Sequence, residues 1–279
     1  MASIAIVTDS TADFAGIEPA DLGITVVPLT VHWGRDVLRD RVDLSTSEFY
    51  DRLRTDPNLP KTAAPPVGIF EEVFRECVSR YDAVIAVHIA ATLSSTWSVA
   101  ANAASTVAPE RIYVVDSTST SVGLGWLVQH AVDLASGDVE ASTIVAALEE
   151  MIPRIRLYLT LESLEYLQRG GRIGRAQAFV GALLSVKPVL QVAEGAVIPI
   201  ERVRTRAGSI RRVAELGTGA GPMERLAVVH GDCEAEAVAV RDELTRRLPE
   251  VPINVTEVGA VIATYTGPGI VGVGCVLAS

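Results

Sequence analysis

The chain has 279 residues, of which 49% are hydrophobic, so it holds enough apolar material for one large core or two of ordinary size. Its net charge of -10 repels nucleic acid and anionic membrane, and it contains no uninterrupted apolar run of about 18 residues that would span a bilayer. Cys77, Cys233 and Cys275 lie far apart and form no CxxC pair, so neither a disulfide framework nor a zinc site is indicated.

Short apolar runs alternate with helical patterns through the first half of the chain. We expect strands at 4–7, 24–29, 83–89 and 112–115, and helices at 46–54, 67–80, 96–107 and 122–135. The first strand follows Met1 almost directly, without the basic region of a signal peptide, so we expect a cytoplasmic protein. Continuous apolar strands between helices predict a parallel sheet covered on both faces. The sequence therefore predicts an N-terminal α/β/α domain over residues 1–156.

Hydroxyl-rich segments follow three of these strands. Asp9 and Ser10 follow the first strand, Ser94 and Ser95 the third, and Ser117 the fourth. Loops at the carboxyl ends of parallel strands converge and form ligand sites, and the start of a helix after Ser94 favours a small anion such as a carboxylate. The alternative is that these residues are ordinary helix caps. Their recurrence in three loops, together with Thr62, keeps a binding site open beside that alternative.

The pattern changes near residue 157. We expect strands at 157–160, 188–192, 196–203, 226–230, 251–258 and 271–277, and helices at 161–168, 175–184, 209–216 and 234–248. The glycines at 170 and 171 end the first of these helices. The segment 263–269 is too rich in turn formers for a strand, and its glycines permit close backbone approach to a ligand or to the other domain. This order predicts a C-terminal α/β domain with a mixed sheet over residues 157–279.

Positive charge is concentrated between residues 154 and 212. This window holds eleven Arg or Lys and four Asp or Glu, a local charge of +7 in an acidic protein. The asymmetry indicates a basic face for an acidic or phosphorylated partner. A solvated helical face is the alternative.

Five motifs occur in the order and at the intervals of one known family. They are IAIVTDST, LSSTWSVAANAA, VVDSTSTSVGLG, LEYLQRGGRIG and TYTGPG, and through them the chain resembles the DegV family over nearly its whole length. The resemblance implies a two-domain fold that buries a long-chain fatty acid and presents its carboxylate to a separate ATP-dependent fatty acid kinase. The acyl phosphate product would serve phospholipid synthesis. It implies no cofactor or metal, no stable membrane insertion, and no complete catalytic machinery in this chain.

The resemblance also implies site residues. Thr62 and Ser94 match the family's threonine and serine that hold the fatty-acid carboxylate, and Ser95 lies beside them. We expect six further residues near the head group: Asp9, Ser10, Ser117, Tyr265, Thr266 and Gly267. Arg172 matches an arginine on the face that engages the kinase, and Arg202 is expected to join it. Tyr265 stands where relatives usually carry histidine, so a phenol replaces a group that titrates near neutral pH.

Two other functions stay open. One is a free-standing hydrolase or transferase that uses Ser94 as nucleophile with a distant histidine, although the sequence has neither a GxxxxGK[ST] loop nor a GxSxG elbow. His230 and Asp232, at a strand end, are the pair that most resembles a catalytic dyad, but their spacing does not establish a hydrogen bond. The other is a carrier or sensor of a different hydrophobic acid, which the change to Tyr265 permits.

Overall fold

The computed structural model describes residues 3–179 and 186–279. The first half contains β1 (Ile4–Asp9), β2 (Thr25–Val27), β3 (Thr30–Trp33), β4 (Asp36–Arg39), α1 (Thr46–Thr55), β5 (Lys61–Ala63), α2 (Val67–Arg80), β6 (Ala83–His88), α3 (Thr96–Val107), β7 (Ile112–Asp116), α4 (Ser121–Ala135) and α5 (Ala141–Met151). The second half contains β8 (Ile155–Thr160), α6 (Glu165–Arg169), β9 (Lys187–Ala193), β10 (Ala196–Val203), α7 (Arg206–Thr218), β11 (Met223–His230), α8 (Glu234–Arg247), β12 (Ile253–Glu257), α9 (Ala260–Thr266) and β13 (Val271–Leu277). Short 3-10 helices lie at Pro19–Leu22, Ile152–Arg154 and Gly174–Phe179.

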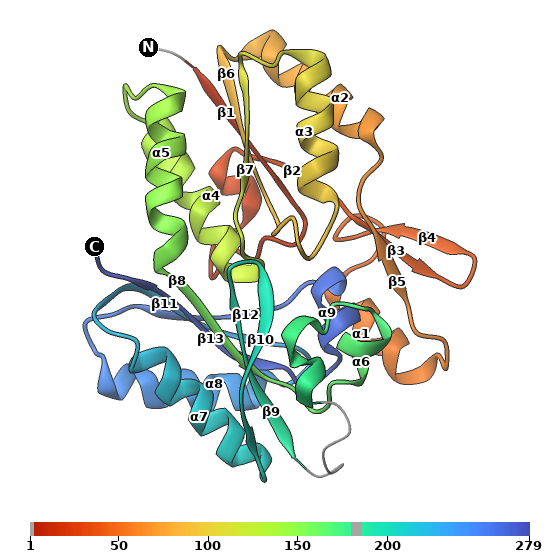
Figure 1. Ribbon diagram of the computed structural model, residues 1–279, viewed down its shortest axis with the longest axis vertical. Helices are drawn as coiled ribbons and strands as arrows, with labels where there is room; N and C mark the ends of the chain where they lie inside the picture. Colours follow the sequence, from red (N-terminus) through yellow and green to blue (C-terminus); the bar gives the residue numbers. More distant parts are fainter. Residues whose placement is uncertain (1–2, 180–185) are drawn as a thin grey trace.

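The N-terminal sheet is parallel, as the apolar runs predict. Its strand order is β2-β1-β6-β7, with helices α2 and α3 on one face and α4 and α5 on the other (Figure 1). Strand β1 shows why both faces are covered: Ala5 and Val7 pack with the residues of α2 and α3, whereas Ile6 packs with those of α4 and α5. The three hydroxyl-rich loops leave this sheet at the edge that faces the second half (Figure 1).

A small antiparallel sheet extends from the first half and was not predicted. Its strand order is β4-β3-β5, and Thr62 of β5 pairs with Val31 of β3. Strand β5 has only three residues, so its sequence alone carries almost no strand signal. The sheet matters because it places β5, which carries Thr62, beside α9 of the second half (Figure 1).

The C-terminal sheet is mixed, as predicted. Its order is β10-β9-β8-β13-β11-β12, and β11 and β12 form a parallel pair while the other neighbours are antiparallel. Val271, Val273 and Cys275 of β13 belong to the core that α7 and α8 cover. Strand β13 has glycine at positions 272 and 274 between these residues, where an added Cβ would lie 2.7 Å from Val229 Cγ2 or 2.8 Å from Leu157 Cδ2, so side chains pack closely against the strand on the opposite side of the sheet.

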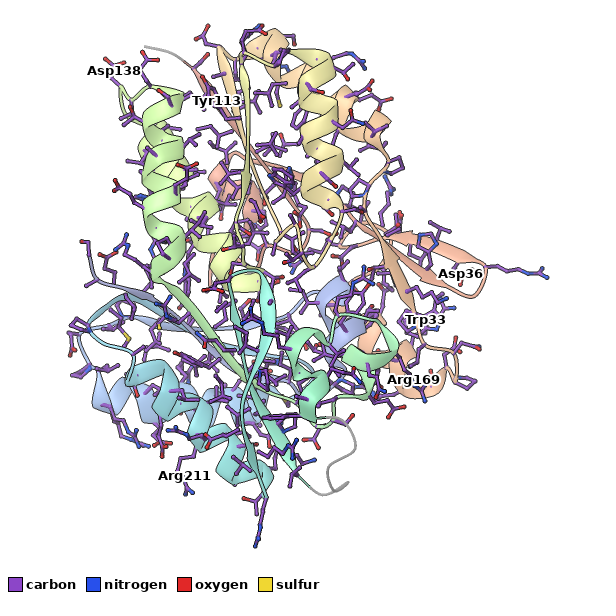
Figure 2. All side chains as sticks on the ribbon, viewed as in Figure 1. Trp33, Asp36, Tyr113, Asp138, Arg169 and Arg211 are labelled. Atoms are coloured by element: carbon purple, nitrogen blue, oxygen red, sulfur yellow. The ribbon has the colours of Figure 1, made fainter. Side chains whose placement is uncertain are left out.

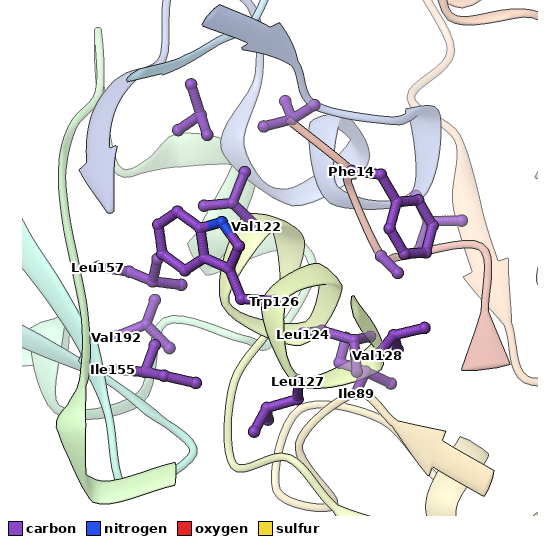
Figure 3. Packing of buried hydrophobic residues seen from close by; sticks show 14 of the residues in the cluster. Phe14, Ile89, Val122, Leu124, Trp126, Leu127, Val128, Ile155, Leu157 and Val192 are labelled. Carbon is purple, nitrogen blue, oxygen red and sulfur yellow. The ribbon is translucent and has the colours of Figure 1, made fainter. Parts of the chain in front are cut away.

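One hydrophobic cluster joins the two halves. It runs from Ile6 of the first sheet through α4 to Val229 of the second sheet. Figure 3 shows Val122 and Trp126 of α4 facing Leu157 of β8. The halves therefore meet through apolar packing rather than through a linker alone.

Several predicted boundaries need correction. The helix expected at 161–168 is the much shorter α6, which ends at Arg169 before the left-handed Gly171, as the two glycines predict. The helix expected at 175–184 is a 3-10 helix up to Phe179, and its remaining positions lie outside the described residues. The segment 263–269 is not a strand, as expected, but its first part belongs to helix α9. Helix α5 was not predicted at all.

Candidate functional site

An apolar cavity lies between the two halves. About 940 Å³ of empty space lies between its lining side chains when the open solvent at its mouth is included. Its apolar wall comes from both halves, with Leu29, Ile89, Leu93 and Val122 from the first and Leu157, Val192, Val229, Val261 and Ile270 from the second. Such a wall suits a hydrocarbon, because burial of apolar surface is its main source of affinity.

A polar groove adjoins this cavity. The groove is lined by residues 62–67 and by the first turns of α3, including Ser95 and Ser98. Thr62, Ser94 and Arg172 line both the groove and the cavity, so they form the mouth where one opens into the other. An amphipathic ligand would therefore place its polar end at these three residues.

Tyr265 closes one side of this mouth. Its phenol oxygen lies 2.6 Å from Thr62 Oγ1, so the small antiparallel sheet and helix α9 are joined by a hydrogen bond. The guanidinium carbon of Arg172 lies 4.8 Å from the centroid of the Tyr265 ring, within the range of a cation–π contact. Arg172 is held in place because it donates to the carbonyl oxygens of Leu93, at 3.2 Å, and Gly170, at 2.8 Å.

Ser94 lies where α3 begins. Its Oγ is 2.8 Å from Thr96 Oγ1 and accepts a longer bond, 3.3 Å, from the Thr96 amide. Ser95, the N-cap residue, makes no side-chain capping bond and lines the groove rather than the cavity. The positive end of α3 thus faces the mouth, which favours an anionic group there.

Three of the expected head-group residues shape the loops instead of lining either hollow. Asp9 accepts hydrogen bonds from the amides of Thr11 and Ile89, both at 3.0 Å. Ser10 accepts one from the Leu29 amide at 3.1 Å, and Ser117 donates one to the Ser119 carbonyl at 3.1 Å. These bonds hold backbone groups of the loops in place, but none of the three residues is the N-cap of the helix that follows, so the capping interpretation does not describe them either.

The two residues beside Tyr265 differ in their placement. Thr266 lines the cavity, and its hydroxyl donates to the Ile262 carbonyl at 3.2 Å. Gly267 ends α9 with a positive φ of 69°, and a Cβ there would lie 2.4 Å from Tyr166 Cδ2. The close backbone approach predicted for this segment is therefore an approach to α6 of the same half.

Residues 120 and 121 line the cavity and were not singled out from the sequence. Thr120 and Ser121 belong to the same run of hydroxyls as Ser117. The Ser121 hydroxyl donates to Asp13 at 2.6 Å, and Asp13 also pairs with Arg41. Burial raises the pKa of Asp13, and the Arg41 charge opposes that shift.

Much of the basic window is neutralised within the chain. Arg206 pairs with Glu236 at 2.5 Å, and Arg169 pairs with Glu165 at 2.7 Å. Arg202 is exposed, donates to the Ala178 carbonyl at 3.0 Å and stacks over Phe179 at 4.4 Å. Figure 2 shows Arg169 and Arg211 on the surface of the second half. Arg172 is the member of the window that reaches the mouth.

The pair formed by His230 and Asp232 is not a catalytic dyad. Asp232 pairs with Arg54, and His230 Nδ1 lies 3.9 Å from Glu257, beyond hydrogen-bond distance. Burial lowers the pKa of His230. Asp232 lies beyond the last residue of β11 and has a left-handed φ of 56°, so it does not continue the strand from His230.

No histidine accompanies Ser94 among the described residues that line the cavity or the groove. His88 is buried with its Nδ1 3.0 Å from Asp9. The part of the chain that the structure describes contains no group of three His, Cys, Asp or Glu side chains placed to hold a metal ion. No helix within residues 3–179 and 186–279 is long and apolar enough to cross a membrane.

Comparison with known proteins agrees with this architecture. A family model described as "Uncharacterised protein, DegV family" matches residues 3–278. The chain is 36% identical over 275 residues to Protein DegV of Bacillus subtilis, an alignment that covers 97% of this chain and 98% of that protein. It is 37% identical over 275 residues to a DegV domain-containing protein of Streptomyces coelicolor, with 97% of each chain covered.

Solved structures are similar over the same length. A DegV family protein from Thermus thermophilus, described by its fatty acid binding, superimposes with a TM-score of 0.91 at 33% identity and covers all of both chains. DegV of Bacillus subtilis, described as a fatty acid binding protein, superimposes with a TM-score of 0.90 at 35% identity, covering 99% of this chain and 100% of that one.

Proposed function

The chain belongs to the DegV family, and we propose that it binds a long-chain fatty acid, with the acyl chain in the apolar cavity and the carboxylate at the mouth. The observation that carries this proposal is the shared lining of Thr62, Ser94 and Arg172, which joins an apolar cavity to a polar groove. The fatty acid binding described for the structural relatives supports it.

The mouth supplies the hydrogen-bond donors that a carboxylate needs. Thr62, Ser94 and Tyr265 each carry a hydroxyl, and a carboxylate accepts about four hydrogen bonds on its two oxygens. The present bond between Thr62 and Tyr265 would give way to bonds from both hydroxyls to the ligand. Arg172, fixed above the Tyr265 ring, would add a positive charge without needing to contact the ligand directly.

We further propose that a separate ATP-dependent kinase phosphorylates the bound carboxylate. The groove leaves the mouth accessible from outside, which a phosphoryl donor on another protein would require. Arg172 and Arg202 are the residues proposed to contact that partner. Their positive charge would attract an acidic surface, and this attraction should weaken as salt rises.

A substrate-presenting role fits Ser94 better than a nucleophilic one. A serine nucleophile needs a neighbouring general base. The Ser94 hydroxyl instead lies beside the Thr96 hydroxyl, and the described residues lining both hollows offer no histidine. A carrier should keep its acid unchanged until kinase and ATP are added, whereas a hydrolase should turn over an activated ester and lose that activity in Ser94→Ala.

Titration of delipidated protein with palmitate or oleate tests the proposed carboxylate site. The double variant Thr62→Val with Ser94→Ala should bind at least about tenfold more weakly, because two hydrogen bonds to a charged group are removed. Ser98→Ala is the matched control, since Ser98 lines the groove but not the cavity. Unchanged affinity in the double variant would refute the site.

A further inference from the structure

Thr120 has a buried hydroxyl without a hydrogen-bond partner, and its residue lines the apolar cavity. Among the described residues, it is the one cavity-lining side chain whose buried oxygen is left unpaired. Other hydroxyls of the wall have partners within the protein: Ser121 donates to Asp13, Thr266 to the Ile262 carbonyl, and Thr62 bonds to Tyr265. Thr120 is therefore a polar feature that the proposed carboxylate site does not use.

The hydroxyl is also free of the helix that Thr120 begins. Threonine at an N-cap position usually accepts a hydrogen bond from an amide of the first turn. Here the Gly123 and Leu124 amides instead donate to the carbonyl oxygen of Thr120, at 3.1 and 3.3 Å, and its side chain makes no capping bond. The Thr120 side chain therefore does not make the capping hydrogen bond that threonine usually makes at this position.

The backbone holds Thr120 firmly in place. Thr118 and Ser121, on either side, have left-handed φ values of 46° and 52°, which are unfavourable for residues other than glycine. The Ser121 amide donates to the Thr11 carbonyl at 3.0 Å, and the Thr118 carbonyl accepts from the Gly195 amide at 3.0 Å. Contacts from both halves therefore fix the loop that carries the hydroxyl.

The chemistry of the position favours an oxygen on the ligand. A buried hydroxyl without a partner is costly, and a saturated acyl chain offers it none. A hydroxyl or oxo oxygen on the chain would accept its hydrogen bond, and the positive end of α4 favours an acceptor at this place. We infer that the cavity selects acyl chains that carry an oxygen substituent, with Thr120 donating to that oxygen. The inference rests on the proposed function, because it assumes that an acyl chain occupies the cavity.

A series of C18 acids tests this selectivity on the full-length, delipidated protein. The series comprises stearate and hydroxystearates substituted at different carbons, compared by calorimetric titration. At least one hydroxystearate should bind at least about fivefold more tightly than stearate, because it pairs the Thr120 hydroxyl. In Thr120→Val the preference should reverse, since the ligand hydroxyl would then lose its partner on leaving water. Thr120→Ser should retain the preference of the wild type.

Thr62→Val separates this inference from the proposed carboxylate site. That variant should weaken every acid by a similar factor and leave the ratio of hydroxystearate to stearate unchanged. Equal affinities across the series in the wild type, as expected if a water molecule pairs with Thr120, would overturn the inference. So would a preference that survives in Thr120→Val. Tight binding of stearate in either case would leave the proposed function standing, whereas failure of every acid to bind would remove both.

Discussion

The Thr62 hydroxyl lies 2.6 Å from the Tyr265 phenol, although 203 positions separate the two residues in the chain. The contact joins a three-residue strand of the first half to a seven-residue helix of the second half. It closes the mouth of the cavity at the position where the sequence resemblance leads us to expect histidine. Tyrosine thus supplies a hydroxyl donor where histidine would supply a group that titrates near neutral pH.

Replacing Tyr265 by histidine should make fatty-acid binding depend on pH. Protonation of the imidazole as pH falls from 7.5 to 5.5 would place a positive charge near the carboxylate, so affinity should rise in Tyr265→His. The wild type should show no such rise, because it has no imidazole at this position. Tyr265→Phe is the control and should bind more weakly without the added pH dependence. Fluorescence titration at several pH values measures all three, and equal pH slopes would contradict the assignment.

Arg172 and Arg202 should separate ligand binding from partner binding. Arg172→Gln should weaken acid binding, because Arg172 lines the mouth and stacks on Tyr265. Arg202→Gln should leave acid binding unchanged, because Arg202 stacks on Phe179 and does not line the cavity. Both variants should slow acyl phosphate formation when a kinase and ATP are supplied. The affinity of each variant for the fatty acid is measured in parallel. A larger loss of affinity in Arg202→Gln than in Arg172→Gln would contradict the placement of Arg172 at the mouth.

The absence of a side chain at Gly274 should help to set the length of acyl chain that the cavity can hold. A Cβ at this position would lie 2.8 Å from both Leu157 Cδ2 and Val122 Cγ2. Gly274→Ala should therefore cost about 1–3 kcal/mol of unfolding free energy and should weaken binding of long acids more than short ones. Gly68→Ala is the matched control, because nothing lies within 4 Å of a Cβ there. Chemical denaturation and titration with C10 to C18 acids check both effects.

The sequence predicts the two main sheets because their strands are continuous apolar runs between helices. It fails for β5, whose three residues become a strand only through pairing with Val31 of β3. It also fails for α9, where the turn-forming TYTGPG segment obscures a helix that packs against α6 and β5. In both cases contacts with distant residues decide the local structure.

The candidate site was predictable only in part for a similar reason. Thr62 and Ser94 were identified through the family motifs, and both lie at the mouth. Within the hydroxyl run at 117–121, composition does not distinguish Ser117, which bonds within its loop, from Thr120, which lines the cavity. The left-handed backbone at Thr118 and Ser121 makes that distinction, and it has no clear signal in the sequence.

Asp40 should make stability fall as pH rises. It is only 1% exposed, and burial raises its pKa to about 6 despite the opposing charge of Arg41. The raised pKa means that its contribution to stability is complete below pH 3.8 and is lost as pH rises through about 6. Asp40→Asn stays neutral, so its advantage over the wild type should grow to on the order of 3 kcal/mol by pH 7.5.

Urea unfolding between pH 4 and pH 7.5 checks this prediction. Asp43→Asn is the control with the opposite sign, because hydrogen bonds from Arg39 lower the pKa of Asp43 to about 2. Its substitution should therefore not stabilise the protein at neutral pH. An Asp40→Asn variant that is no more stable than the wild type at pH 7.5 would show that the buried carboxylate is compensated in the folded protein.

Native mass spectrometry of the purified protein, followed by denaturing extraction and identification of any released molecule, tests the central claim most directly. The account predicts one long-chain acid per protein chain, unchanged in the absence of kinase and ATP. A protein that is empty on purification and also fails to take up added fatty acids would contradict the account.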